Sequence, residues 1–325
     1  MRPPLCALPL FILACLSARA ESLVPSDTAA RMLVVPFTSR TVDDAAFLAG
    51  DRNAGKDVNL AGILRLPAGQ GPFPVVVLVE GSGGIGQNID FWDRNFLSHG
   101  VGTFIVDGFT GRGIDNVIND QSQLGLMNMI VDVYRRLGAI AKDPRVDPKR
   151  IALMGFSRGG LTVLYASLKR FQDAWNMSGV TPAAYIPLYP VCNFDYRQGE
   201  DVAGGPIRIF HGAADDYVPI GPCEDYVKRL KAAGRDAEIM ALPGAYHAFD
   251  LALLPPSLEL PKAQKTACIL KEDASGAILN QATGKPWAPA DPCNGVGAHI
   301  GYSAEATATT QKAVNAFVST TLGAK

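Results

Sequence analysis

Residues 151–161 read IALMGFSRGGL, an apolar run that passes through Gly155, Ser157 and Gly159 into a helix-forming stretch. A Gly-x-Ser-x-Gly pattern between a strand and a helix is typical of a nucleophile elbow. There a sharp turn strains the backbone of the serine and exposes its hydroxyl above the sheet. The following helix directs its free N–H groups and its positive dipole end toward that hydroxyl. Short patterns also arise by chance, so the rest of the chain decides the meaning of this one.

Two further polar groups follow in the order that a nucleophile elbow requires. FHGAADDYVP places Asp215 and Asp216 just after an apolar run, and LPGAYHAFD places His247 just after the next. Serine, acid and histidine in this order, each at the end of a strand, are typical of α/β-hydrolase triads. A neutral imidazole takes the proton of the serine, and a carboxylate holds the imidazole in the right tautomer. Spacing leaves the choice between the two acids open, and His211, which precedes them, is interpreted as structural.

Apolar runs and helical stretches alternate along most of the chain. Several of the runs are continuously apolar, as strands buried on both faces of a parallel sheet are. The sequence therefore predicts an α/β-hydrolase fold, with a mostly parallel sheet of about eight strands flanked by helices on both faces. The expected strands are RMLVVPF, NLAGILRLP, PVVVLVE, GTFIVDGF, RIALMGFS, AAYIPLYP, PIRIFHG and AEIMALPG, and the expected helices cover 90–99, 124–142, the stretch from 158 toward 169, 223–233 and 305–322.

The alternation stops between residues 251 and 302, which are rich in proline, glycine and alanine. We interpret this segment as a long irregular excursion between the last strand and the last helix. No shift in composition and no linker divides the chain, so residues 21–325 are expected to form a single domain.

Four of the six cysteines follow residue 20, and four cysteines allow three pairings. We favour a disulfide between Cys192 and Cys223, which lie near two strand ends, and one between Cys268 and Cys293, which would staple the excursion. Four free thiols are the alternative, and export disfavours them. No C-x-x-C and no H-x-x-x-H spacing is present, so neither a metal site nor a cofactor is expected.

The N-terminal stretch MRPPLCALPLFILACLSARA combines an early arginine, an apolar core and a small-x-small end. It predicts a signal peptide over residues 1–20 and hence a periplasmic or secreted protein. A buried N-terminal helix is one alternative. Lipidation at Cys15, which would tether the protein to a membrane, is another.

Charge argues against large anionic partners. Removal of residues 1–20 takes away two arginines and no acid, so the 30 basic residues become 28 against 31 acidic ones. With no block of lysine or arginine, the chain lacks the electrostatic footprint of a nucleic-acid or anionic-membrane binder. We expect a small, neutral or modestly charged substrate; the sequence contains no indication of the oligomeric state.

The loop VEGSGGIGQ (79–87) satisfies G-x-G-x-x-G, and Asp107 lies where a ribose-binding acid would stand. A nicotinamide site is nevertheless disfavoured, because two expected strands precede this loop and an exported protein leaves the nicotinamide pool behind. In an α/β-hydrolase the loop after an early strand supplies an oxyanion N–H. We therefore expect the backbone of Gly81 or Ser82, together with that of Arg158, to bind the oxyanion.

With these positions placed, the chain resembles the dienelactone hydrolase family of α/β-hydrolases, in its exported branch. The resemblance rests on the motifs GPFPVVVLVEGSGG, VDGFTGRG, DPRVDPKRIALMGFSRGG, YPVC, HGAADDYVPIGPCE and PGAYHAFD. It implies that Ser157 is the nucleophile, that Asp215 rather than Asp216 is the acid and that His247 is the base. The positions of Cys192 and Cys223 also fit a cysteine pair of exported members.

Two features bear on the substrate that the resemblance implies. Ser157 stands where the well-known dienelactone enzymes have cysteine, and serine suits general ester hydrolysis. Glu80 matches a glutamate of those enzymes; pairing with Arg158 would let it shape the pocket, whereas hydrogen bonds to loop amides would make it structural. The sequence thus predicts hydrolysis of small carboxylic esters or lactones. A noncatalytic binding protein and, more remotely, an NAD-dependent oxidoreductase are the alternatives.

Overall fold

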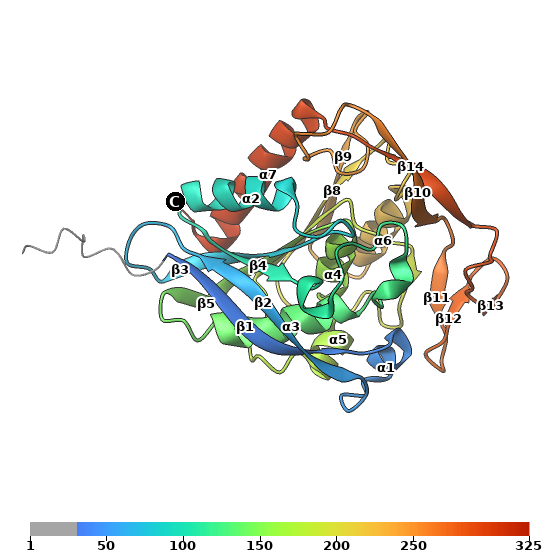
Figure 1. The fold of residues 1–325 in the computed structure, drawn as a ribbon, viewed down its shortest axis with the longest axis horizontal. Helices are drawn as coiled ribbons and strands as arrows, with labels where there is room; N and C mark the ends of the chain where they lie inside the picture. The colour runs from blue at the N-terminus through green and yellow to red at the C-terminus, as the bar shows by residue number, and fades with distance from the viewer. Residues whose placement is uncertain (1–30, 325) are drawn as a thin grey trace, which may run out of the picture.

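A computed structural model describes residues 31–324, so the expected signal peptide and Cys15 lie outside the described residues. Figure 1 shows a central sheet between two layers of helices. Eight strands hydrogen bond in the order β1-β2-β4-β3-β5-β6-β8-β9. The β1–β2 and β2–β4 pairs are antiparallel, and every later pair is parallel. The predicted fold class is confirmed.

The elements follow the predicted alternation of strand and helix. The strands of the large sheet are β1 (Met32–Thr41), β2 (Lys56–Arg65), β3 (Phe73–Val79), β4 (Gly102–Asp107), β5 (Val146–Phe156), β6 (Ala184–Leu188), β8 (Ile207–Gly212) and β9 (Ala237–Leu242). The α-helices are α1 (Asp44–Ala49), α2 (Gln87–Ser98), α3 (Asn128–Ile140), α4 (Arg158–Tyr165), α5 (Lys169–Trp175), α6 (Gly221–Ala232) and α7 (Ala304–Leu322), and two short 3₁₀ turns are η1 (Thr110–Arg112) and η2 (Gln121–Gln123).

The central strands are buried on both faces, and alternate side chains enter two separate cores. In β3, Val75, Val77 and Val79 pack into one core, whereas Val76 and Leu78 pack into the other. This division follows from the two-residue period of a strand. It explains why β3 and the end of β5 are apolar throughout.

Helices cover both faces of the sheet. The first core receives side chains from α1, α3, α4, α5 and α6, and the second from α2 and α7, which lie together on the other side (Figure 1). The chain enters α4 directly from the C-terminal end of β5. The sheet thereby brings the ends of β3, β5, β8 and β9 to one edge, where the loops of a doubly covered α/β sheet form a site.

The segment from 251 to 302 is not irregular, and here the expectation is wrong. It contains β10 (Leu258–Thr266) paired antiparallel with β14 (Asn294–Ile300). Between them, β11 (Leu270–Glu272), β12 (Ile278–Asn280) and β13 (Lys285–Pro286) form a small sheet with β7 (Phe194–Asp195). Most of these strands are two or three residues long and separated by glycine or proline, which hides their period in the sequence. We call residues 258–300 the insert.

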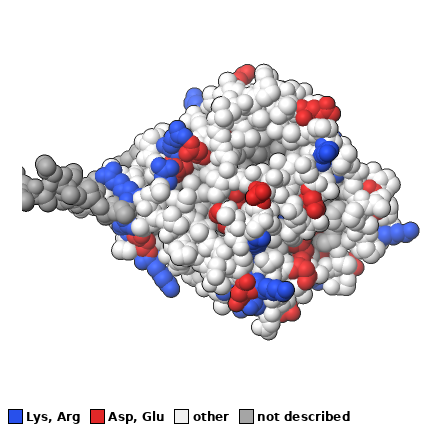
Figure 2. Space-filling model, viewed as in Figure 1, with Lys and Arg blue, Asp and Glu red and all other residues white. Residues whose placement is uncertain are grey.

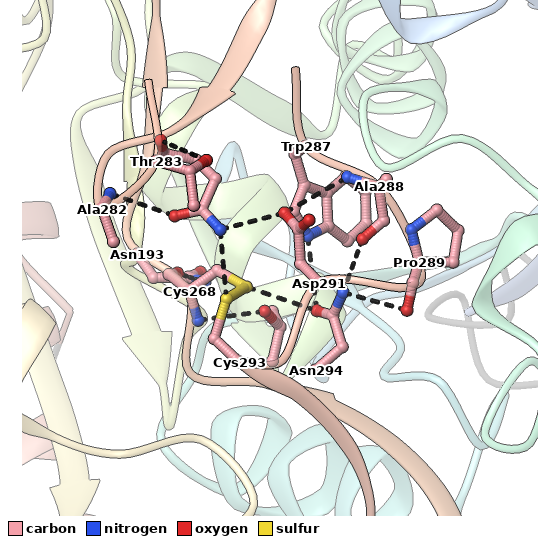
Figure 3. Close-up of a disulfide and its surroundings, with 12 residues drawn as sticks. Asn193, Cys268, Ala282, Thr283, Trp287, Ala288, Pro289, Asp291, Cys293 and Asn294 are labelled. Carbon is pink, nitrogen blue, oxygen red and sulfur yellow. Dashed lines mark hydrogen bonds between the residues drawn. A yellow bond between two sulfur atoms is a disulfide. The ribbon is translucent and has the colours of Figure 1, made fainter. Parts of the chain in front are cut away.

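Disulfides join both cysteine pairs that the sequence favoured. Cys192 is bonded to Cys223, and Cys268 is bonded to Cys293 across the base of the β10–β14 pair. Figure 3 shows Asn193 beside the second disulfide, where its side-chain amide donates to the Cys268 carbonyl oxygen at 2.6 Å. The side-chain amide of Asn280 lies 3.3 Å from the Cys293 sulfur. The bond therefore closes residues 268–293 of the insert into a loop.

Charges of both signs are interspersed over the face of the protein that Figure 2 shows, and wide parts of this face carry no charged side chain. No broad field of one sign is in view over the described residues. Between residues 31 and 324, no helix combines the length and the apolar character needed to cross a bilayer.

We expect replacement of Cys268 and Cys293 by serine to destabilise the protein by about 3 kcal/mol, since the bond closes a loop with a sequence separation of 25 residues. Urea unfolding of the oxidised wild type and the double variant measures the difference. The Cys192→Ser/Cys223→Ser variant, with a separation of 31, is the matched comparison. Equal unfolding midpoints for wild type and the Cys268/Cys293 variant would contradict the prediction.

Candidate active site

The turn from β5 into α4 places Ser157 in a strained conformation. Its φ is 55° and its ψ is −112°, which is rare for a residue with a side chain. The turn is tight because two glycines permit it: a Cβ on Gly155 would lie 2.1 Å from the Gly159 carbonyl oxygen, and one on Gly159 would lie 2.2 Å from that of Val79. The Gly-x-Ser-x-Gly pattern is thus a steric requirement of this fold.

The structure brings Ser157, His247 and Asp215 together. The Ser157 hydroxyl lies 2.8 Å from His247 Nε2, and His247 Nδ1 lies 2.7 Å from Asp215 Oδ2. The three residues follow β5, β9 and β8, whose C-terminal ends lie at the same edge of the sheet. Separate loops therefore bring together residues that are up to 90 positions apart in the sequence.

Asp215 is buried but ionised. Burial acts to raise its pKa, but the electrostatic interaction with His247 and the hydrogen bonds from His211 and His247 outweigh burial and hold the pKa well below its usual range. Oδ1 also accepts hydrogen bonds from the backbone N–H groups of Tyr217 and Val218. An ionised carboxylate only accepts, so Nδ1 of His247 carries the proton and Nε2 is free to accept from Ser157.

His211 has the structural place that the sequence assigned to it. Its Nε2 lies 2.8 Å from the Val218 carbonyl oxygen and 3.4 Å from Asp215 Oδ2. The ring is fully buried at the end of β8. It therefore supports the loop that carries the acid.

Asp216 points away from the triad and binds the insert instead. Its two carboxylate oxygens contact the backbone N–H and Nδ1 of His299, both at 2.8 Å. Close by, the Gly301 N–H donates to the His247 carbonyl oxygen at 3.0 Å. The end of β14 thus holds both the acid loop and the histidine loop, a role that the composition of the insert did not indicate.

A buried network supports the other side of the His247 ring. Tyr189 lies edge-on to this ring at a centroid distance of 4.7 Å. Its hydroxyl donates to Asp250, which also accepts from the Trp92 indole at 2.8 Å. The sequence gives neither Tyr189 nor Trp92 a recognisable role, because neither belongs to a pattern with a known chemistry.

Two residues expected to donate to the oxyanion, Gly81 and Arg158, lie next to Ser157. A side chain on Gly81 would lie 3.0 Å from the Phe156 carbonyl oxygen and 3.5 Å from Ser157 Cβ. The Gly81 carbonyl oxygen accepts from Gly84, and because N–H and C=O oppose each other in a trans peptide, the Ser82 N–H points out of that turn. Arg158 is the first residue of α4, where backbone N–H groups have no partner within the helix.

The suggested pairing of Glu80 with Arg158 is not formed. Among the described residues, the Arg158 guanidinium donates to Gln121 Oε1 at 2.7 Å and to the Leu124 carbonyl oxygen. Glu80 instead accepts a 2.7 Å hydrogen bond from the Gly108 N–H. The alternative, a carboxylate bonded to a loop amide, is therefore the arrangement that the fold adopts. Gln121 was missed because a lone glutamine in a polar loop has no sequence signature.

Glu80 is only 1% exposed and directly precedes Gly81 in the loop 79–87, which we call the oxyanion loop after its expected role. Burial raises the pKa of Glu80 to about 8, and the nearby charges of Asp107 and Asp132 add to this shift, while the Gly108 hydrogen bond and Arg112 oppose it. The carboxyl group is therefore protonated in the folded protein at neutral pH. Asp107, the acid of the dinucleotide alternative, accepts hydrogen bonds from Phe109 and Thr110 in its own turn.

The residues that the structure describes include one group with metal-ligand proximity, formed by Cys268, Asp291 and Cys293. Both of its sulfur atoms are already bonded to each other, so only the carboxylate remains to bind an ion. This group therefore does not fit a metal site.

We expect the free energy of unfolding to fall as pH rises from about 4.5 to about 8. In this window Glu80 is ionised in the unfolded chain but protonated in the native one, so unfolding releases a proton. Glu80 alone can lower the free energy of unfolding by at most about 1.4 kcal/mol per pH unit.

Glu80→Gln should remove this pH dependence, whereas Glu224→Gln, at an exposed position, should keep it. Urea unfolding at pH 5, 6.5 and 8 tests both variants. Parallel pH profiles for wild type and Glu80→Gln would contradict the assignment.

Known proteins are similar to this chain in sequence and in fold. The model of a family described as the dienelactone hydrolase family matches residues 60–267. A Yersinia pestis protein provisionally named carboxymethylenebutenolidase is 28% identical over 210 residues, which cover 60% of this chain and 74% of the relative. A Methylorubrum extorquens protein with the same provisional name is 24% identical over 247 residues, covering 71% and 82%.

Two solved structures have the same fold. A provisionally assigned dienelactone hydrolase from Klebsiella pneumoniae superposes with a TM-score of 0.54 at 15% identity, covering 88% of this chain and 99% of its own. A dienelactone hydrolase-like promiscuous phosphotriesterase from metagenomic libraries gives 0.52 at 16% identity, covering 89% and 98%. The family match spans more than half of the chain and agrees with the observed sheet. The chain therefore belongs to the dienelactone hydrolase family and is a carboxylic-ester hydrolase.

Proposed function

We propose that the chain is an exported serine hydrolase that cleaves small carboxylic esters or lactones through an acyl-enzyme. Ser157 is the nucleophile, His247 the general base and Asp215 the residue that orients it. The observation that carries this proposal is the continuous path of hydrogen bonds from the Ser157 hydroxyl through His247 to Asp215, at 2.8 and 2.7 Å. These distances suit a base that takes the proton of its nucleophile.

Acylation begins with attack of the Ser157 oxygen on the carbonyl carbon of the ester. His247 Nε2 takes the hydroxyl proton, and the ionised Asp215 stabilises the resulting imidazolium. The negative charge moves to the carbonyl oxygen, where the backbone N–H groups of Gly81 or Ser82 and of Arg158 bind it. When the intermediate collapses, the carbon–oxygen bond of the ester breaks, and the alcohol leaves with the proton from His247.

Deacylation repeats these steps with water. His247 removes a proton from a water molecule, whose oxygen attacks the acyl carbon, and the same donors bind the second oxyanion. The bond to Ser157 then breaks, and His247 returns the proton to the serine oxygen. A lactone follows the same course, except that its alcohol stays joined to the acyl group, so a single hydroxy acid is released.

A cleft beside the oxyanion loop is suited to the larger part of the substrate. It has a volume of about 430 Å³ and runs between this loop and β10 of the insert. Its walls combine apolar and amide side chains with one lysine, which suits a small ester better than a polymer. The lining residues are Gly83, Asn116, Ile118, Asn119, Leu260, Pro261 and Lys262.

Export is supported by the sequence of residues 1–20 and by the two disulfides, since disulfides persist in oxidising compartments. Residues 21–325 are proposed to form one domain, of which the insert is a part. The name of the two relatives denotes a lactone, a butenolide, as substrate, and lactones are kept in the proposal for that reason.

Purified protein should release nitrophenolate from p-nitrophenyl acetate, and Ser157→Ala should lose at least about a thousandfold in kcat, because the nucleophile is removed. A p-nitrophenyl phosphonate should add one phosphonyl group to wild type on Ser157, as peptide mass spectrometry reads out. Ser122→Ala, an exposed serine in η2, should keep full activity. A folded wild type that neither turns over nor is labelled would favour a noncatalytic binding protein and overturn the proposal.

Leu260→Trp should shift the preference toward short acyl groups, because indole fills part of the cleft. We expect the ratio of kcat/KM for p-nitrophenyl octanoate to that for the acetate to fall about tenfold or more, within the range of a lost apolar contact. Leu253→Trp, at a position that is 85% exposed and not in the lining, is the control. If Leu260→Trp leaves the octanoate-to-acetate ratio of kcat/KM unchanged, the acyl group does not bind in this cleft.

A further inference from the structure

Gln121 contacts several parts of the candidate active site at once. It begins the 3₁₀ turn η2, in the loop between β4 and α3. Its side chain meets Ser82 in the oxyanion loop and Arg158 beside the nucleophile, and its backbone meets Gln264 in the insert. Its side chain also hydrogen bonds to Tyr217, the second residue after the acid.

The orientation of the Gln121 amide follows from its partners. The Arg158 guanidinium can only donate, and its Nη1 lies 2.7 Å from Gln121 Oε1. The NH₂ group therefore faces Ser82, and Nε2 donates to the Ser82 hydroxyl at 3.1 Å. One planar amide thus links the side chains of two residues whose backbone N–H groups are candidate oxyanion donors.

Both partners of Gln121 are otherwise firmly held. Arg158 is 2% exposed and also donates to the Leu124 carbonyl oxygen. Ser82 is 9% exposed, and its carbonyl oxygen accepts from the Val117 N–H at 2.8 Å. The loop that carries Gln121 therefore binds Ser82 through both its backbone and its side chain. No other link between the side chains of Ser82 and Arg158 is formed among the described residues.

We propose that Gln121 is a positioning residue that sets the separation between the oxyanion loop and the first N–H of α4, by binding Ser82 with its NH₂ group and Arg158 with its carbonyl oxygen. This inference rests on the proposed function. It assigns Gln121 no contact with the substrate. Its effect is greatest when the oxyanion forms, because small displacements of such donors strongly reduce the rate.

Gln121→Met tests this role, since methionine keeps the length of the side chain and loses its hydrogen bonds to Ser82, Arg158 and Tyr217. We expect kcat for p-nitrophenyl acetate to fall about 10- to 100-fold, with KM within about twofold of wild type. Titration with the phosphonate counts functional sites, so kcat is expressed per labelled serine and a misfolded fraction does not mimic the effect. Phosphonylation of Ser157 also builds up negative charge on the phosphoryl oxygen, so its rate in Gln121→Met should fall by a factor similar to that of kcat.

Gln121→Glu is the second variant, because it keeps an acceptor for the buried Arg158 and should preserve the fold. Its ionised carboxylate would face Ser82 near the oxyanion. We expect a loss of kcat that grows as pH rises through the titration of the new carboxyl group and is absent from the wild-type profile. A residue with a purely structural role would not produce this new pH dependence.

Gln123→Met is the matched control. Gln123 belongs to the same turn, is exposed, and donates only to the backbone carbonyl oxygens of Asn116 and Asp120. Its kcat per labelled serine should equal that of wild type.

The outcomes separate the two proposals. A wild type without turnover or labelling overturns the proposed function and this inference together. An active wild type with unchanged kcat per site in Gln121→Met overturns the inference alone, and so does a rise in KM at constant kcat, which would instead indicate substrate binding. If kcat per labelled serine falls equally in Gln121→Met and Gln123→Met, the inference is also overturned, because the loss would then reflect disruption of the whole turn η2.

Discussion

The close approach of backbone to backbone where β5 turns into α4 is the constraint on which the rest of the structure depends. Gly155 and Gly159 leave no room for a Cβ, and the turn between them forces Ser157 to a positive φ. Such strain persists only where the surrounding structure maintains it. Here the parallel strands on either side of β5 and the two cores hold both ends of the turn, so the serine hydroxyl is fixed at the edge of the sheet.

The groups around this turn are held by several layers of contacts. His247 lies between Tyr189 and Tyr217, whose rings are 4.7 and 4.9 Å from its own. The insert adds a second support, because its last strand binds Asp216 through His299, and Gly301, which follows that strand, binds the His247 carbonyl oxygen. The Cys268–Cys293 disulfide lies at the opposite end of the same strand pair. In this way, a segment outside the proposed triad helps to fix the geometry of that triad.

Two buried carboxyl groups near Ser157, those of Asp215 and Glu80, differ in protonation state because their surroundings differ. The electrostatic interaction with His247 and the hydrogen bonds from His211 and His247 keep Asp215 ionised, and this acceptor fixes the tautomer of the neutral imidazole. Glu80 has one hydrogen bond from a neutral amide and two acids nearby, so burial prevails and its pKa is raised to about 8. Partners, and not depth alone, decide whether a buried acid carries a charge.

Much of this protein is determined by local pattern. The apolar runs predicted the strands, and the order of Ser157, Asp215 and His247 predicted loops that meet at one edge, because a parallel sheet aligns the ends of its strands. Both cysteine pairs were likewise the favoured ones. The tertiary structure alone decided the strands of the insert, the partner of Glu80 and the place of Gln121. Each depends on contacts between segments far apart in the chain, and a single polar residue or a three-residue strand has no periodicity that would reveal such contacts in advance.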